Sequence, residues 1–239
     1  MKTISTTKNL FFCLVLSFFF SGFSQTKEQQ FIEAHDAKTG EENLAVYNGS
    51  VHINKDVVQE NESRYLYDEY HNCTVFYLGQ TFYNIKCKYD LVEDKLVILP
   101  FNSNSTIGIN AITMAVDSFY MADNSQKFIN IDQAAFSAEK DGFYEILVAN
   151  DGISLFGKHS KKKFQRIIDR KTFDVFQERT DFYVGYQEKL IEVSNRKSIV
   201  KLFPDKEEEI NSYFKSQKQL QKKDFSLFLK KLFLQISAS

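Results

Sequence analysis

The chain has 239 residues, of which 43% are hydrophobic, and its formal net charge at pH 7 is −1. This near-neutral balance offers no basic footprint for nucleic acid or for an anionic membrane. The chain contains 24 Phe and 12 Tyr but no Trp and only 2 Pro. Such a composition favours β-sheet and excludes little about activity, because it contains no residue pattern tied to one chemistry.

Residues 1–24 predict a cleavable secretory signal. A short lysine-containing start precedes an apolar core at residues 10–20 (LFFCLVLSFFF), and Gly22 and Ser24 supply the small residues of a cleavage site. The apolar core is about half as long as a membrane-spanning helix, and no later stretch reaches that length. We therefore expect a periplasmic or outer-envelope/extracellular protein with no transmembrane span in the mature chain, and a flexible lead-in at residues 25–43.

Residues 44–239 predict a single β-rich domain with a helical C-terminus. A basic run from Lys158 to Arg166 closes its first half, and we expect Lys161, Lys162 and Lys163 within this run to form a solvated loop. The expected strands lie in a hairpin at 44–53 turning at Asn48-Gly49, in three strands at 73–101 turning at 78–80 and 93–94, at 107–109, 112–121 and 128–131, in a hairpin at 142–157, and in a pair at 173–184 and 189–193.

The C-terminal part, about 195–236, predicts two or three helices. Ser194 or Asn195 can cap a helix that Pro204 ends, and a last helix begins at Asp224. That last helix carries an apolar stripe that must be buried, most simply on the chain's own sheet: Phe225, Phe228, Leu229, Leu232, Phe233 and Ile236. Strands first and helices last indicate an α+β fold, with an antiparallel, curved sheet built of consecutive hairpins.

Cysteine usage agrees with export. Cys13 lies inside the predicted signal, so Cys73 and Cys87 are the cysteines of the mature chain. They lie on the two arms of one predicted hairpin that turns near Gly79. A three-residue loop would set them opposite each other, and a two-residue loop would turn them to different faces. A single disulfide and two buried free thiols both satisfy this pattern.

No reactive constellation stands out in the sequence. His35, His52, His71 and His159 have no metal-ligand spacing, so we expect no metal site, no cofactor and no catalytic residues that sequence alone can identify. Aromatic side chains at Tyr65, Tyr67 and Tyr70 are candidates for a binding face. In aromatic pairs within strands, such as those beginning at Phe143 and Phe182, we expect one ring in the core and the other exposed, because neighbouring side chains point to opposite faces.

Several motifs occur here in an order that resembles a known group. They are Asn48-Gly49, the hairpin VFYLGQTFYNIKCKYDLVEDKLVIL, the unit GFYEIL-x4-G-x-SLF, and KSIVKLFPDKEEEINSYFKSQ before a final amphipathic helix. The chain resembles, over most of residues 44–236, a group of uncharacterised exported proteins common in Bacteroidetes-type bacteria. That resemblance implies an envelope location and one domain, and it carries no activity.

The sequence favours a protein that is not an enzyme, because it contains no recognisable catalytic motif. We expect an envelope-associated binding or adaptor module that contacts an envelope protein, or an apolar or glycan ligand, through its curved sheet, without nucleic acid. The alternative is a carboxylate-dependent hydrolase acting on envelope polymers. Two acids whose carboxyl groups lie about 5 to 10 Å apart in a cleft would favour it.

Overall fold

The computed structural model describes Ile32 and residues 44–100, 107–131, 140–150, 153–186 and 189–238. The predicted signal at 1–24 and lead-in at 25–43 lie outside these residues, apart from Ile32. The strands are β1 (Gly49–Val51), β2 (His71–Tyr77), β3 (Gln80–Asp90), β4 (Lys95–Leu99), β5 (Ile109–Ala111), β6 (Val116–Met121), β7 (Gln126–Asn130), β8 (Phe143–Asn150), β9 (Ile153–Ile168), β10 (Lys171–Tyr186) and β11 (Lys189–Glu192). The helices are α2 (Arg196–Leu202), α3 (Glu207–Ser216), α4 (Lys218–Lys223) and α5 (Phe225–Ala238).

One antiparallel sheet of eleven strands organises the described part of the chain, in the order β1-β5-β4-β3-β2-β6-β7-β8-β9-β10-β11. Most neighbours in the sheet are also neighbours in the chain, so hairpins build it, and the helices follow at the C-terminal end. The predicted α+β class is confirmed. Residues Ala45–Ser239 form one compact unit. The predicted middle helix is divided at Gln217 into α3 and α4, which gives four C-terminal helices where the sequence predicts two or three.

The sheet curls strongly between β3 and β9. The ring of Tyr89 on β3 lies 5.8 Å from that of Phe143 on β8, although three strands separate β3 from β8. The backbone N–H of Lys161 on β9 donates to the carbonyl of Leu91, just after β3, at 2.9 Å. Four fully buried rings in mutual contact fill the concave side, and they are Tyr89, Phe119, Phe128 and Phe143.

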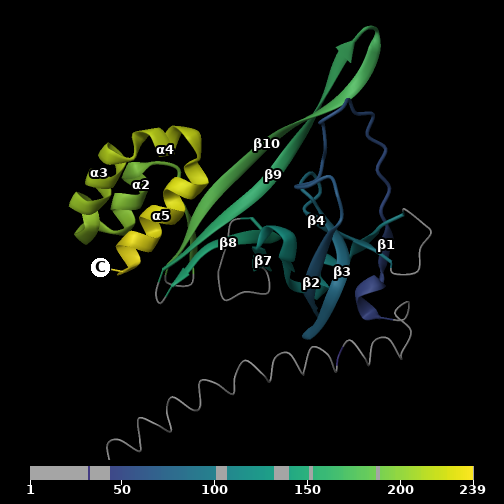
Figure 1. Cartoon of the computed structure of the whole chain (residues 1–239), viewed down its shortest axis with the longest axis horizontal. Coiled ribbons are helices and arrows are strands. Elements are labelled where there is room, and N and C mark those ends of the chain that lie inside the picture. The colour runs from purple at the N-terminus through teal and green to yellow at the C-terminus, as the bar shows by residue number, and fades with distance from the viewer. Residues whose placement is uncertain are drawn as a thin grey trace, which may run out of the picture. The chain divides into compact units, whose positions relative to one another are not determined.

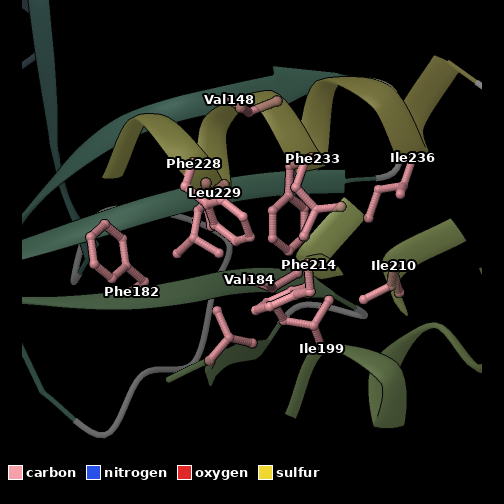
Figure 2. Close-up of a cluster of buried hydrophobic side chains, with 13 residues drawn as sticks. Val148, Phe182, Val184, Ile199, Ile210, Phe214, Phe228, Leu229, Phe233 and Ile236 are labelled. Atoms are coloured by element: carbon pink, nitrogen blue, oxygen red, sulfur yellow. The ribbon is translucent and has the colours of Figure 1, made fainter. Parts of the chain in front are cut away.

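The helices cover one face of the β8–β9–β10 region (Figure 2). Helix α5 buries its apolar stripe against strand residues such as Leu155 and Val184, which confirms the expected packing on the chain's own sheet. Its N-terminus is capped by Asp224, whose side chain accepts a hydrogen bond from the N–H of Leu227 at 2.8 Å. Of the two caps that the sequence allows, Ser194 and Asn195, it is Asn195 that caps α2, in a reciprocal capping box with Ser198.

Two expectations about the strands are wrong. The hairpin expected at 44–53 is a short 3-10 helix, Ala45–Tyr47, followed by β1, which pairs with the distant β5. Gly49 serves a close approach there, because a Cβ on it would lie 2.1 Å from the carbonyl oxygen of Asn110. Both rings of the Phe143–Tyr144 and Phe182–Tyr183 pairs are buried, since this part of the sheet is covered on both faces.

Candidate functional site

The longest strands among the described residues, β9 and β10, form a hairpin that runs from the helices to a projecting turn (Figure 1). Its strands pair continuously from Ser154–Gly185 to Ile168–Lys171. Asp169 and Arg170 form the two-residue turn with φ of 49° and 66°, the positive values that hairpin turns with matching twist require.

The loop expected at Lys161, Lys162 and Lys163 is wrong, because β9 continues through these residues and through the whole basic run from Lys158 to Arg166. Side chains alternate along this run, so that Lys162, Phe164 and Arg166 point to one face while Lys163 points to the other. Phe173 and Val175 of β10 lie on the same face as Phe164 and Arg166, because they pair directly with them. The run is basic in composition, yet its pattern has the period of a strand.

One face of the distal hairpin carries cations and apolar side chains in alternation. The register places Phe164 opposite Val175 and Arg166 opposite Phe173. The ring of Phe164 is 40% exposed, and the Lys162 ammonium lies over it at 5.2 Å from the ring centroid. We call this surface the basic-aromatic strip, and its members are Lys162, Phe164, Arg166, Lys171, Phe173 and Val175. In the described part of the chain, no ion pair joins Lys162, Arg166 or Lys171 to an acid.

The opposite side of the hairpin is held by residues 54–64, which we call the brace. The Lys163 ammonium lies 2.9 Å from a carboxylate oxygen of Asp56, and this hydrogen bond raises the pKa of Lys163. The N–H of Asp174 donates to the carbonyl of Val57 at 2.7 Å, and the Val57 N–H donates back to the Asp174 carboxylate at 3.0 Å. These bonds fix the hairpin along the edge of β10 and on the face that carries Lys163 and Asp174, which is opposite to the face of the basic-aromatic strip.

Arg64 anchors the brace to the sheet. Its guanidinium contacts Asp90 at 2.9 Å, Asp56 at 3.2 Å and Glu93 at 3.0 Å. Arg64 is 6% exposed, Asp90 is fully buried and the side chain of Asp56 is 2% exposed. A hydrogen bond from Lys95, helped by Arg64, lowers the pKa of Glu93. The three acids around Arg64 are therefore ion-pair partners that stabilise the fold. This pairing favours their charged form, whereas a general acid must carry a proton.

The three candidate tyrosines do not lie together on one surface. Tyr65 and Tyr70 enclose the ammonium of Lys88, which lies 4.8 and 4.6 Å from their ring centroids. The Tyr65 hydroxyl is hydrogen-bonded to His52 at 2.6 Å, and burial, with the Asp90 carboxylate adding to it, raises the pKa of Tyr65 to about 12. Tyr67 instead donates to Gln126 at 2.8 Å. Binding by these rings stays a prediction, and in this structure Tyr65 and Tyr70 hold the chain's own lysine.

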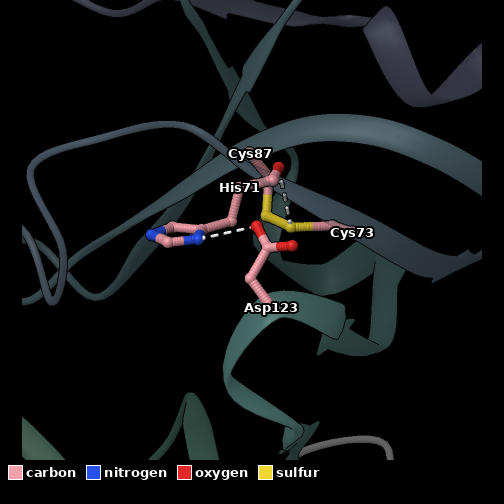
Figure 3. The surroundings of a disulfide bond; sticks show 4 residues. All are labelled: His71, Cys73, Cys87 and Asp123. Atoms are coloured by element: carbon pink, nitrogen blue, oxygen red, sulfur yellow. Dashed lines mark hydrogen bonds and ion pairs between the residues drawn. A yellow bond between two sulfur atoms is a disulfide. The ribbon is translucent and has the colours of Figure 1, made fainter.

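Cys73 and Cys87 are joined by a disulfide between β2 and β3 (Figure 3). The turn between these strands has two residues, which by itself would place the cysteines on opposite faces. A bulge opposite Thr74 adds one residue to β3, with Asn84 at φ 56°, and it restores a common face. Cys73 then pairs with Ile85 and lies diagonal to Cys87, with their Cα atoms 6.1 Å apart. Both sulfur-bearing residues are buried, at 2% and 0% exposure, so this bond acts within the fold.

A row of polar side chains crosses β7 to β10. Gln126 donates to Glu145 at 3.0 Å, Glu145 contacts His159 at 2.6 Å, and His159 is hydrogen-bonded to Thr180 at 3.0 Å. A hydroxyl, an imidazole and a carboxylate in sequence also form the relay of some hydrolases. Here each group ties one strand to its neighbour, and the ring of Phe128 packs on the imidazole at 6.1 Å. The predicted hydrolase alternative stays a prediction.

Comparison with protein-family models, with curated proteins and with solved structures found no significant match to the chain. The resemblance to exported envelope proteins therefore stays a prediction. Among the described residues, no helix is long and apolar enough to cross a membrane. Within the same residues, no group of three or more His, Cys, Asp or Glu side chains could hold a metal ion.

Proposed function

We propose that this protein is an exported binding or adaptor module that contacts an acidic partner protein of the cell envelope through its basic-aromatic strip. The observation that carries the proposal is the strip itself: Phe164 is exposed, Phe173 and Val175 beside it are half-buried, and the flanking cations have no acidic partner among the described residues. Rigid apolar area favours association because little conformational entropy is lost on binding.

The charge of the strip sets the character of the partner. Lys162, Arg166 and Lys171 project beside Phe164 and Phe173, so a complementary surface presents carboxylates around an apolar centre. The concave side of the sheet is an unsuitable contact surface, because it is filled by the chain's own buried aromatic rings. The strip lies on the surface of a hairpin and mixes charged with apolar side chains. Such a surface suits a partner protein better than a small ligand, which needs a deep pocket.

The test combines affinity capture from native envelope with titration of the captured protein. The charge-reversed variant Lys162→Glu/Arg166→Glu is expected to weaken binding at least about tenfold, and added salt is expected to weaken wild-type binding. The matched control reverses two exposed lysines of the helices, Lys222→Glu/Lys230→Glu, and is expected to bind as wild type does.

Equal binding by wild type and the Lys162→Glu/Arg166→Glu variant would overturn the proposed contact surface. Equal weakening by the control would also overturn it, because the attraction would then reflect overall charge. Export has a separate readout. The N-terminus of protein recovered from native cells is expected at Gln25, and an intact Met1 would overturn that part of the proposal.

A further inference from the structure

We infer that the helical layer holds an anion-binding site for a phosphomonoester, in a pocket between α2, α3 and α4. The pocket has a volume of about 650 Å³. Three cations from three different helices line it: Arg196 of α2, Lys215 of α3 and Lys218 of α4. This inference is independent of the proposed function, because none of these residues belongs to the basic-aromatic strip.

The charge in the pocket is not neutralised within the protein. Among the described residues that line it, none carries a carboxylate. No ion pair joins Arg196, Lys215 or Lys218 to an acid in the described part of the chain. Cations of like sign on facing helices repel one another, and a bound anion removes that repulsion. Arg196, Lys215 and Lys218 are exposed, so each can turn its charged group toward an anion in the pocket.

The other lining groups define the class of anion. Arg196 offers a planar fork of N–H donors that fits two oxygens of a phosphate, and the two lysines add point charges. The side-chain amides of Asn211 and Gln221 add uncharged donors, and the buried ring of Phe214 forms an apolar part of the lining. A pocket of this volume exceeds what a bare phosphate ion fills, so it has room for an organic body beside the charged group.

A neighbouring hollow of about 380 Å³ extends the positive surface. Arg196 and Asn211 line both hollows, and Lys197 and Lys201 lie in the second, where Glu207 is also present. The first pocket, which has no acid in its described lining, is the stronger position for a dianion. Because α2 has seven residues, the site rests on side chains from three helices that line one hollow and not on a helix dipole.

Isothermal titration of the full chain tests the site with three probes: inorganic phosphate, glucose phosphate, and phosphatidylcholine vesicles with and without phosphatidic acid. Wild type is expected to bind glucose phosphate, the vesicles that contain phosphatidic acid, or both, and the two arms distinguish a soluble ligand from a lipid headgroup. Arg196→Gln and Lys215→Gln are each expected to weaken binding about tenfold, since each removes one charge-assisted hydrogen bond. Arg196→Lys is expected to restore part of the affinity.

The matched control is Lys230→Gln, which removes an exposed lysine of α5 outside the pocket and is expected to bind as wild type does. Unchanged thermal melting of each variant shows that the helices remain packed. Absence of binding by wild type to all three probes overturns the inference. Equal weakening by Lys230→Gln and Arg196→Gln also overturns it, because binding would then follow total charge and not this pocket.

Discussion

Replacing Arg64 by Met is expected to destabilise the protein strongly and to release the brace from the hairpin. Met has a similar length and fills the space of the side chain but carries no charge. The change leaves Asp90 and Asp56 buried without their guanidinium partner, since Asp90 is fully buried and the Asp56 side chain is 2% exposed. Asp90 keeps two backbone N–H donors, from Val92 and Glu93, and Asp56 keeps Lys163.

The magnitude follows from this partial loss. Removing one partner of a buried ion pair costs about 3–5 kcal/mol, because the other charge stays desolvated. The donors that remain place the expected loss near the lower end, about 3 kcal/mol of the free energy of unfolding. Against a total stability of roughly 5–15 kcal/mol this is a large fraction. With a urea m-value of about 3 kcal/mol/M, the midpoint of unfolding moves down by about 1 M.

Urea unfolding followed by circular dichroism at pH 7 measures this loss. Hydrogen exchange gives a second readout, since amides of residues 54–64 are expected to lose protection while α5 keeps it. The matched control is Arg166→Met on the exposed strip, with an expected change below about 0.5 kcal/mol. A midpoint for Arg64→Met equal to that of the control would refute the reasoning, because it would show that the buried carboxylates do not depend on Arg64.

Four further variants test separate parts of the fold. Replacing Cys73 and Cys87 together by Ser is expected to lower the unfolding free energy by about 3 kcal/mol, because the bond closes a loop with a sequence separation of 14, and chemical denaturation measures this. Gly142→Ala is expected to cost about 1–3 kcal/mol by the same measurement, since φ is 92° and the new Cβ would overlap a carboxylate oxygen. Leu232→Ala is expected to cost about 2–5 kcal/mol by leaving a cavity under α5, and a melting temperature equal to wild type would contradict that packing. The pKa of Tyr65 is about 12 in the folded protein and about 10 in the unfolded chain, so the free energy of unfolding falls as the pH rises from 10 to 12. Tyr65→Phe is expected to reduce the slope of unfolding free energy against pH in this range by about one proton, which urea unfolding at several pH values measures.

The elements that the sequence predicts well are those with local signals. Asn195 and Asp224 cap helices through side chains a few residues from the groups they bind, so their role is visible in a short window. The stripe of α5 repeats at helical spacing, which predicts burial without knowledge of the partner surface. Hairpins with short turns, such as β2–β3 around Gly79, are local in the same sense.

Features set by distant pairing are not visible in this way. Asn48-Gly49 has the composition of a hairpin turn, yet β1 pairs with β5, whose residues lie far along the chain. The bulge at Asn84 changes which side chains of β3 face inward. Cys87 and Phe82 are both buried, whereas a regular strand would place them on opposite faces because five positions separate them. The run from Lys158 contains enough lysine to resemble a loop, and only its pairing with β10 makes it a strand.

Net charge is a weak predictor of binding surfaces in this protein, because it sums over surfaces of opposite sign. A chain of charge −1 can still present local positive surfaces when its acids are bound elsewhere. In this fold Asp56 and Asp90 are occupied by Arg64 inside the brace. Cations on the strip, such as Arg166, and in the helical pocket, such as Arg196, have no such partner among the described residues. The fold separates paired from unpaired charge among the described residues, and this separation is the basis of both anionic contacts that we propose.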